Sequence, residues 1–135
     1  MADIRQVTQD FAVAPQIALE DLPAIRARGF VRVINNRPDH EAPDQPTSAE
    51  VADAARAAGL DYVHIPVTGR PSLEQAAATR EAADTAGGPA LAFCRSGTRS
   101  ITAWSLGQAA AGAKAPEELV RLGAGAGYDL SPLFG

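Results

Sequence analysis

One short segment, residues 90–100, constrains the fold of this chain more than any other. It begins with an apolar run, Ala90–Phe93, that predicts a buried strand, and the only cysteine of the 135 residues, Cys94, follows directly. A polar, Gly-containing loop then leads at Ser100 into a segment that is predicted to be helical as far as Ala111. Such a strand–loop–helix turn directs backbone N–H groups to one point, where the positive end of the helix dipole also lies. We therefore expect this loop to bind an oxyanion and to stabilise a thiolate at Cys94.

The rest of the chain alternates between strand and helix patterns. Two capping boxes, Thr47 to Glu50 and Ser72 to Gln75, mark helix starts. This alternation predicts a single three-layer α/β domain, residues 1–135, with a mainly parallel sheet covered on both faces. The loops after residues 34, 65 and 93 should then meet at one edge of the sheet, where ligands bind. Residues 11–14 and 16–18 are expected to form two short strands or one bent edge strand around Pro15, and further strands are expected at 30–34, 62–65 and 90–93. Helices are expected at 20–28, 47–58, 72–86, 100–111 and 116–123.

Composition excludes several classes of function. A net charge of -4 argues against nucleic-acid binding, because no basic face is expected. One cysteine excludes an internal disulfide and a CxxC redox pair. Two distant histidines and no cluster of acids predict no metal site, and we expect no cofactor. No apolar leader and no run of membrane-spanning length is found, so we expect a cytoplasmic protein without a membrane partner.

Two enzyme families use a cysteine loop of this kind. Residues 94–106 resemble the active loop and following helix of rhodanese sulfurtransferases, in which a cysteine accepts sulfane sulfur as a persulfide. The layout of residues 16–112 is similar instead to the dual-specificity cysteine phosphatases. With Val-Ile-Asn-Asn-Arg-Pro-Asp at residues 33–39, the chain resembles a bacterial family of rhodanese-like or phosphatase-like proteins, whose domain is also found fused to a metallo-β-lactamase-like sulfur dioxygenase. The resemblance implies cysteine-phosphatase-like topology and a sulfur dioxygenase as a partner.

Two departures from the phosphatase pattern bear on the reaction. Phosphatases of this type place one residue more between cysteine and arginine than the four that separate Cys94 from Arg99. They also carry an aspartate general acid shortly after Ile-Pro-Val, where this chain has Thr68, Gly69 and Arg70. Sulfur transfer from thiosulfate releases sulfite, which needs no acid to leave.

We therefore predict a rhodanese-type sulfurtransferase that works through a Cys94 persulfide, with thiosulfate or a persulfide as donor and a thiol as acceptor. The alternative is a phosphatase that acts on a phosphate ester through a Cys94 phosphocysteine. A non-catalytic sulfur carrier or anion-binding module is the third hypothesis. The smaller ring and the missing acid favour the first, and the topology favours the second.

The candidate site residues take different roles. Cys94 is the expected nucleophile, and the planar fork of Arg99 is expected to bind paired oxygens of the anion. Four residues outside this loop are weaker candidates, because each could have a purely structural role. Asn36 could form a turn, and Arg37 and Asp39 could form an ion pair with each other. His64 could occupy a core position, or it could serve as an acid or orient the thiol. Further contacts to the anion or thiolate are expected from Arg95, Ser96, Gly97, Thr98 and Ser100.

Overall fold

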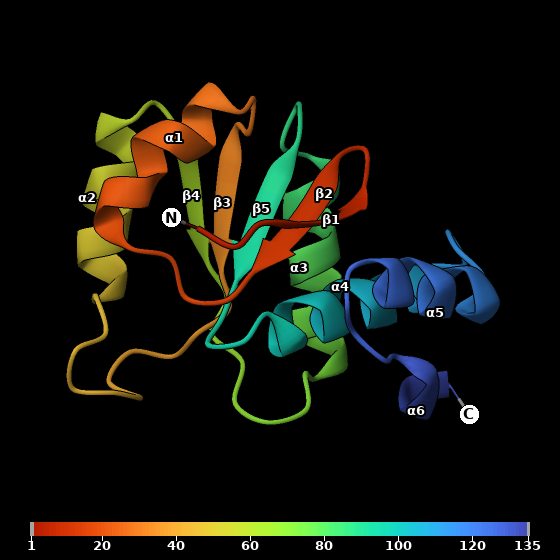
Figure 1. The fold of residues 1–135 in the computed structure, drawn as a ribbon. Helices are drawn as coiled ribbons and strands as arrows, with labels where there is room; N and C mark the ends of the chain where they lie inside the picture. Colours follow the sequence, from red (N-terminus) through yellow and green to blue (C-terminus); the bar gives the residue numbers. More distant parts are fainter. Residues whose placement is uncertain (1, 135) are drawn as a thin grey trace.

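The structure, a computed structural model, describes residues 2–134 and has three layers, with a five-stranded sheet between two groups of helices (Figure 1). All neighbouring strands pair in parallel except the first two, which form an antiparallel hairpin. The predicted three-layer α/β class with a mainly parallel sheet is therefore confirmed. The strands are β1 (Arg5–Thr8), β2 (Phe11–Ala14), β3 (Arg32–Asn35), β4 (Asp61–His64) and β5 (Ala90–Phe93), in the order β1-β2-β5-β3-β4.

The helices divide between the two faces of the sheet. In Figure 1, α1 and α2 cover one face and α3 and α4 cover the other, while α5 and α6 extend beyond α4 on the side of β1. A 3-10 turn, Leu19–Asp21, precedes α1. The bounds are α1 (Leu22–Ala27), α2 (Ser48–Ala57), α3 (Leu73–Asp84), α4 (Thr98–Ala110), α5 (Pro116–Gly125) and α6 (Ser131–Phe134).

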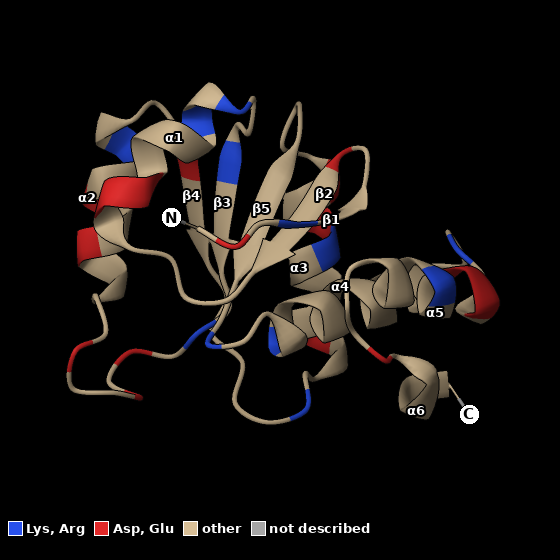
Figure 2. Cartoon of the chain, in the orientation of Figure 1, with Lys and Arg blue, Asp and Glu red and all other residues tan. Residues whose placement is uncertain are grey.

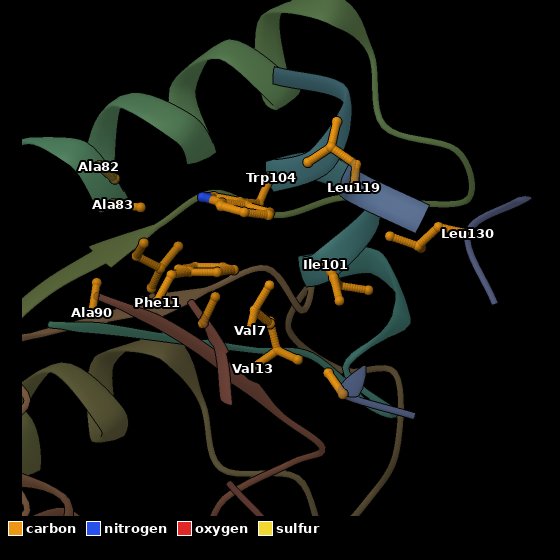
Figure 3. Packing of buried hydrophobic residues seen from close by; sticks show 13 residues of the cluster. Val7, Phe11, Val13, Ala82, Ala83, Ala90, Ile101, Trp104, Leu119 and Leu130 are labelled. Atoms are coloured by element: carbon orange, nitrogen blue, oxygen red, sulfur yellow. The ribbon is translucent and has the colours of Figure 1, made fainter. Parts of the chain in front are cut away.

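Each face of the sheet packs its own group of apolar side chains. On the α3–α4 face, Trp104 stacks on Phe11 with ring centroids 4.7 Å apart, above Val13 and Ile101 (Figure 3). On the α1–α2 face, the buried cluster contains Leu91 and Phe93 of β5 with apolar residues of both helices. Because β5 is buried on both faces, it forms a rigid support for the loop that follows it.

Both predicted capping boxes are present and determine where α2 and α3 begin. The Thr47 hydroxyl accepts the Glu50 N–H at 3.2 Å, and the Glu50 carboxylate accepts the Thr47 N–H at 2.9 Å. Ser72 and Gln75 form the same reciprocal pair, at 3.1 and 2.9 Å. These bonds satisfy N–H groups that an uncapped helix start would leave unpaired.

The prediction for the first twenty residues is wrong in two ways. Residues 16–18 do not form a strand, because Pro15 turns the chain away and the Gln16 N–H donates instead to the Arg95 carbonyl at 3.2 Å. Residues 5–8 do form one, the edge strand β1. Its pattern is weak because only Val7 is buried, so the sequence carries little alternation of apolar and polar residues.

The carboxyl ends of the parallel strands lie level with each other. Phe93 of β5 aligns with Ala14 of β2 and with Asn35 of β3, which in turn aligns with His64 of β4. Four loops therefore leave the sheet at one edge: the three predicted loops after β3, β4 and β5, and the loop after β2. Figure 2 shows basic segments gathered on these loops and acidic segments on the connection between β3 and α2.

Within residues 2–134, no helix combines the length and apolarity that a membrane crossing requires.

Candidate active site

Cys94 lies at the end of β5, fully buried, where the chain turns into α4. The backbone N–H of Gly97 donates to its Sγ at 3.1 Å. Gly97 has a φ of 89°, in the left-handed region that glycine adopts without strain, and α4 begins immediately after it at Thr98, two residues before the predicted start. The thiol thus faces both a backbone donor and the N-terminal end of a long helix, as expected from the sequence.

The loop after Cys94 is held from outside at two successive carbonyl groups. The Gln16 N–H donates to the Arg95 carbonyl at 3.2 Å, and the Tyr128 hydroxyl donates to the Ser96 carbonyl at 2.8 Å. Among the described residues all peptide bonds are trans, so the N–H of each held peptide points away from its carbonyl. For the Ser96–Gly97 peptide that direction is toward Cys94.

Arg99 is held by a carboxylate and a backbone carbonyl. Its Nη1 and Nη2 donate to Glu41 Oε2 and Oε1 at 2.7 and 2.8 Å, and Nη1 also donates to the Val67 carbonyl at 2.8 Å. The Glu41 carboxylate, and to a smaller degree a Cys94 thiolate, raise the pKa of Arg99. Within residues 2–134 the Nε–H and one Nη2–H of Arg99 donate to no hydrogen-bond acceptor, and these two donors form one side of the guanidinium fork. Arg99 is therefore fixed in place with a two-donor face free for an anion.

Glu41 is a site residue that the sequence analysis missed. Its Oε1 also accepts the Nε–H of Arg37 at 2.9 Å, so one carboxylate joins two arginines. The hydrogen bond from Arg99 and a smaller contribution from Arg37 lower the pKa of Glu41 to about 2. The carboxylate is therefore ionised at neutral pH. The i,i+4 spacing of Arg37 and Glu41 was the one local signal of this pair in the sequence.

The other candidates outside the loop take structural positions. Asn36 donates to the Ile65 carbonyl and to Thr79, at 3.0 and 3.2 Å. Asp39 accepts the Ser48 N–H at 2.7 Å, at the start of α2, so the predicted alternative of an ion pair with Arg37 is wrong. His64 Nε2 bonds to the Arg37 carbonyl at 2.9 Å rather than to the thiol. These side chains shape the loops around the site, and only Arg37 reaches Arg99, through Glu41.

The remaining loop residues differ in exposure. Arg95, Ser96 and Thr98 are exposed at the rim, and the Ser96 hydroxyl donates to that of Thr98 at 3.0 Å. Ser100 is fully buried, and within the described residues its hydroxyl has no hydrogen-bond partner.

Two cavities lie at opposite edges of the sheet. One of about 250 Å³ is lined by Arg99 together with Arg70, Thr98 and Leu133, and it offers room beside the candidate site. A larger one of about 460 Å³ lies at the amino ends of β2 and β5 and contains none of the candidate residues. In the part of the chain that the structure describes, no three His, Cys, Asp or Glu side chains gather as a metal site.

Solved structures with a similar fold show the structural class to which this chain belongs. A crystal structure described as a putative phosphatase from Neisseria meningitidis Z2491 is 30% identical and superposes with a TM-score of 0.84, covering 96% of this chain and 92% of the other. Tk-PTP in its active form, 21% identical, gives 0.72 over 95% and 87% of the two chains. A variant of P. aeruginosa TpbA in complex with pTyr, 10% identical, gives 0.67 over 93% and 75%. The fold is that of the cysteine phosphatases.

Sequence comparison assigns the chain to one family among the proteins that share this fold. Residues 3–111 match the family described as beta-lactamase hydrolase-like protein, phosphatase-like domain, and the chain belongs to this family. The beta-lactamase hydrolase-like protein of Agrobacterium fabrum is 37% identical over 127 residues, which are 93% of this chain and 29% of that protein. The chain thus spans less than a third of this relative. The family resemblance seen in the sequence is confirmed, and the sulfur dioxygenase partner stays a prediction.

Proposed function

We propose that this phosphatase-like domain is a cysteine-dependent phosphatase for phosphate monoesters, with Cys94 as nucleophile and Arg99 as the anion-binding residue. The observation that carries the proposal is the pairing of a backbone N–H on Cys94 Sγ with a guanidinium held so that one two-donor face stays free. This reverses the order of our two hypotheses from the sequence. Its family and its phosphatase-like neighbours support this order, and the complex of TpbA with pTyr supports a phosphate ester as substrate.

The proposed reaction has two steps. The Cys94 thiolate attacks phosphorus, an S–P bond forms, the ester P–O bond breaks, and the leaving oxygen takes a proton from water. Water then attacks the phosphocysteine, the S–P bond breaks, and phosphate and the thiolate are released. Arg99 and the N–H groups at the start of α4 stabilise the negative charge on the phosphoryl oxygens. Arg95, Ser96, Thr98 and Ser100 are further proposed contacts to the anion, and Gly97 provides the N–H on the thiolate.

A sulfurtransferase is the second candidate, because two features of the chain still favour it. The ring between Cys94 and Arg99 is one residue shorter than in the phosphatases it resembles, and no carboxyl follows Val67 before Arg70. In this reaction the thiolate attacks the sulfane sulfur of thiosulfate, the S–S bond breaks, and sulfite leaves. The persulfide then passes its sulfur to an acceptor thiol.

Mass spectrometry and turnover distinguish the two reactions. For the phosphatase we expect hydrolysis of an aryl phosphate by the wild type, its loss in Cys94→Ser, and an acid-quenched adduct of about 80 Da on Cys94. Arg99→Lys should lose most of the activity, since a point charge cannot replace a two-donor fork. For the sulfurtransferase, thiosulfate would add about 32 Da, which a dithiol would remove. A thiosulfate adduct without any aryl phosphate hydrolysis would contradict our proposal.

A further inference from the structure

The Ser96–Gly97 peptide bond connects Cys94 to a residue of the C-terminal segment. On one side of this peptide the Gly97 N–H donates to Cys94 Sγ at 3.1 Å, and on the other side the Ser96 carbonyl accepts the Tyr128 hydroxyl at 2.8 Å. The three groups form a chain from hydroxyl to carbonyl, through the planar amide, to the sulfur. Each bond in such a chain polarises the next, so the outer hydrogen bond strengthens the inner one.

Tyr128 fits this position closely. It lies between α5 and α6, 32 residues from Ser96, and its backbone N–H donates to the Gly123 carbonyl at 2.8 Å. The Arg5 guanidinium lies over its ring, 5.3 Å from the centroid. A Cβ at residue 97 would overlap the Tyr128 hydroxyl, so the contact requires glycine there. The ring is thus held on one side by β1 and on the other by the loop.

The hydrogen bond from Tyr128 to the Ser96 carbonyl opposes rotation of the Ser96–Gly97 peptide. Glycine adopts conformations that other residues avoid, so the peptide before Gly97 could rotate and present its carbonyl to the sulfur. A carbonyl oxygen would repel a thiolate, whereas the N–H stabilises it. The hydrogen bond from Tyr128 requires the carbonyl to stay outside, and therefore keeps the N–H inside.

We propose that Tyr128 is a positioning residue for Cys94, which holds the Ser96–Gly97 peptide with its N–H on the sulfur and strengthens that bond. The proposal rests on the proposed function only in taking Cys94 as the nucleophile. Residue 128 lies beyond residues 3–111, which match the family, so the role belongs to the segment that follows the matched region.

The surrounding charges are compatible with this role. Burial raises the pKa of Tyr128, Arg5 opposes this, and a Cys94 thiolate raises it further. The Tyr128 hydroxyl, with its pKa raised above its ordinary value, therefore keeps its proton at neutral pH. Arg99 also faces Cys94, with Glu41 behind it, and Asp3 is paired with Arg5 at 3.0 Å.

The test is Tyr128→Phe, which keeps the ring and removes only the hydroxyl. The two readouts are the pH dependence of Cys94 alkylation by iodoacetamide and the amide proton shift of Gly97 in NMR spectra. The alkylation midpoint should move to higher pH by roughly half a unit to one unit, and kcat/KM for an aryl phosphate below the midpoint should fall about 3- to 10-fold, since one hydrogen bond to a charged partner is weakened. The Gly97 amide proton should move upfield, as its hydrogen bond lengthens.

Thr85→Val is the matched control. It also removes a hydroxyl, one that donates to the Glu81 carbonyl at 2.7 Å at the end of α3, away from the Cys94 loop. It should leave the midpoint and the Gly97 shift unchanged. An unchanged midpoint and Gly97 shift in Tyr128→Phe, or an equal midpoint shift in both variants, would overturn the proposal. Alkylation and NMR need no substrate, so they decide this question even if Cys94 hydrolyses no phosphate ester.

Discussion

The Glu41 carboxylate binds both Arg37 and Arg99, and these ion pairs should make the stability of the fold depend on pH. Its pKa falls from 4.5 to about 2 in the folded protein, chiefly through Arg99 and less through Arg37. A carboxyl with a lowered folded pKa stabilises the fold above its unfolded pKa, and this contribution disappears as the pH falls through the folded value. The wild type should therefore exceed Glu41→Gln in free energy of unfolding by a constant amount above about pH 5, and this difference should shrink toward pH 2. Denaturant titrations at each pH measure it; a difference that persists unchanged to about pH 3 would contradict these ion pairs.

The same variant should affect activity through Arg99. An amide in place of the carboxylate turns one acceptor into a donor that faces the guanidinium, so Arg99 loses its fixed orientation. We expect kcat/KM for an aryl phosphate to fall by roughly tenfold. Glu50→Gln removes a charge at the start of α2 and keeps its capping box, because glutamine also serves at that position, and it should keep full activity. Equal losses in the two variants would mean that only the local charge matters.

Single residues of the site were predictable where the signal was local. The pattern from Ala90 to Arg99 is continuous in sequence, so strand, thiol and loop could be read together. Glu41 and Tyr128 lie 58 and 32 residues from their partners in the loop. Their positions depend on the path of two connections, which no periodicity or motif specifies.

Two glycines in helices should respond in opposite ways to alanine. In α4, a Cβ on Gly107 would lie 2.5 Å from the Ala76 carbonyl oxygen and 2.8 Å from Arg80 Cβ, so α3 and α4 would have to move apart. Gly125 of α5 has no atom within 4 Å of its Cβ position. Alanine is the better helix former by about 1 kcal/mol in a helix interior.

We therefore expect Gly107→Ala to destabilise the fold by roughly 1–3 kcal/mol through overpacking, and Gly125→Ala to be neutral or to stabilise it by up to about 1 kcal/mol. Urea unfolding of the two variants measures both. Stabilisation by Gly107→Ala would mean that the contact between α3 and α4 is looser than the structure has it.

Elements were predictable to the extent that their ends carry chemical signals. The capping boxes at Thr47 and Ser72 placed α2 and α3 because the cap, the third residue and the apolar face lie within one turn. β1 carries no such signal, and its place at the sheet edge follows from pairing with β2. The segment after Pro15 looks like a strand in isolation, but the Cys94 loop provides the partner for its N–H group.

At the scale of the whole molecule, the fold and the reaction depend on different features of the chain. Parallel strands whose carboxyl ends lie level bring four loops to one edge of the sheet. The alternating pattern predicted three of these loops, those after residues 34, 65 and 93. The same fold can host different reactions at that edge, because the reaction depends on a few groups. Here we propose that those groups are the thiol of Cys94, the guanidinium of Arg99 with one free face, and the ionised Glu41 carboxylate behind it.

The final prediction concerns the leaving group, for which we propose no general acid among residues 2–134. Glu41 is ionised, Asp39 accepts a hydrogen bond at the start of α2, and residues 68–70 carry no carboxyl. General acid catalysis contributes about 10² to 10⁴ in rate, so alkyl phosphates should be hydrolysed slower than activated aryl phosphates by at least that factor.

A series of phosphate monoesters that differ in leaving-group acidity measures this dependence. The logarithm of kcat/KM should fall steeply as the leaving group becomes more basic, and the rate should rise with pH to a plateau, because only the thiolate has to form. Asp39 and Asp44 are carboxyls of the connection between β3 and α2, the same connection that carries Glu41. Asp39→Asn and Asp44→Asn should leave the slope unchanged. A shallow slope with a rate that falls again at high pH would mean that a carboxyl does protonate the leaving group, and the variant that steepens the slope would identify it.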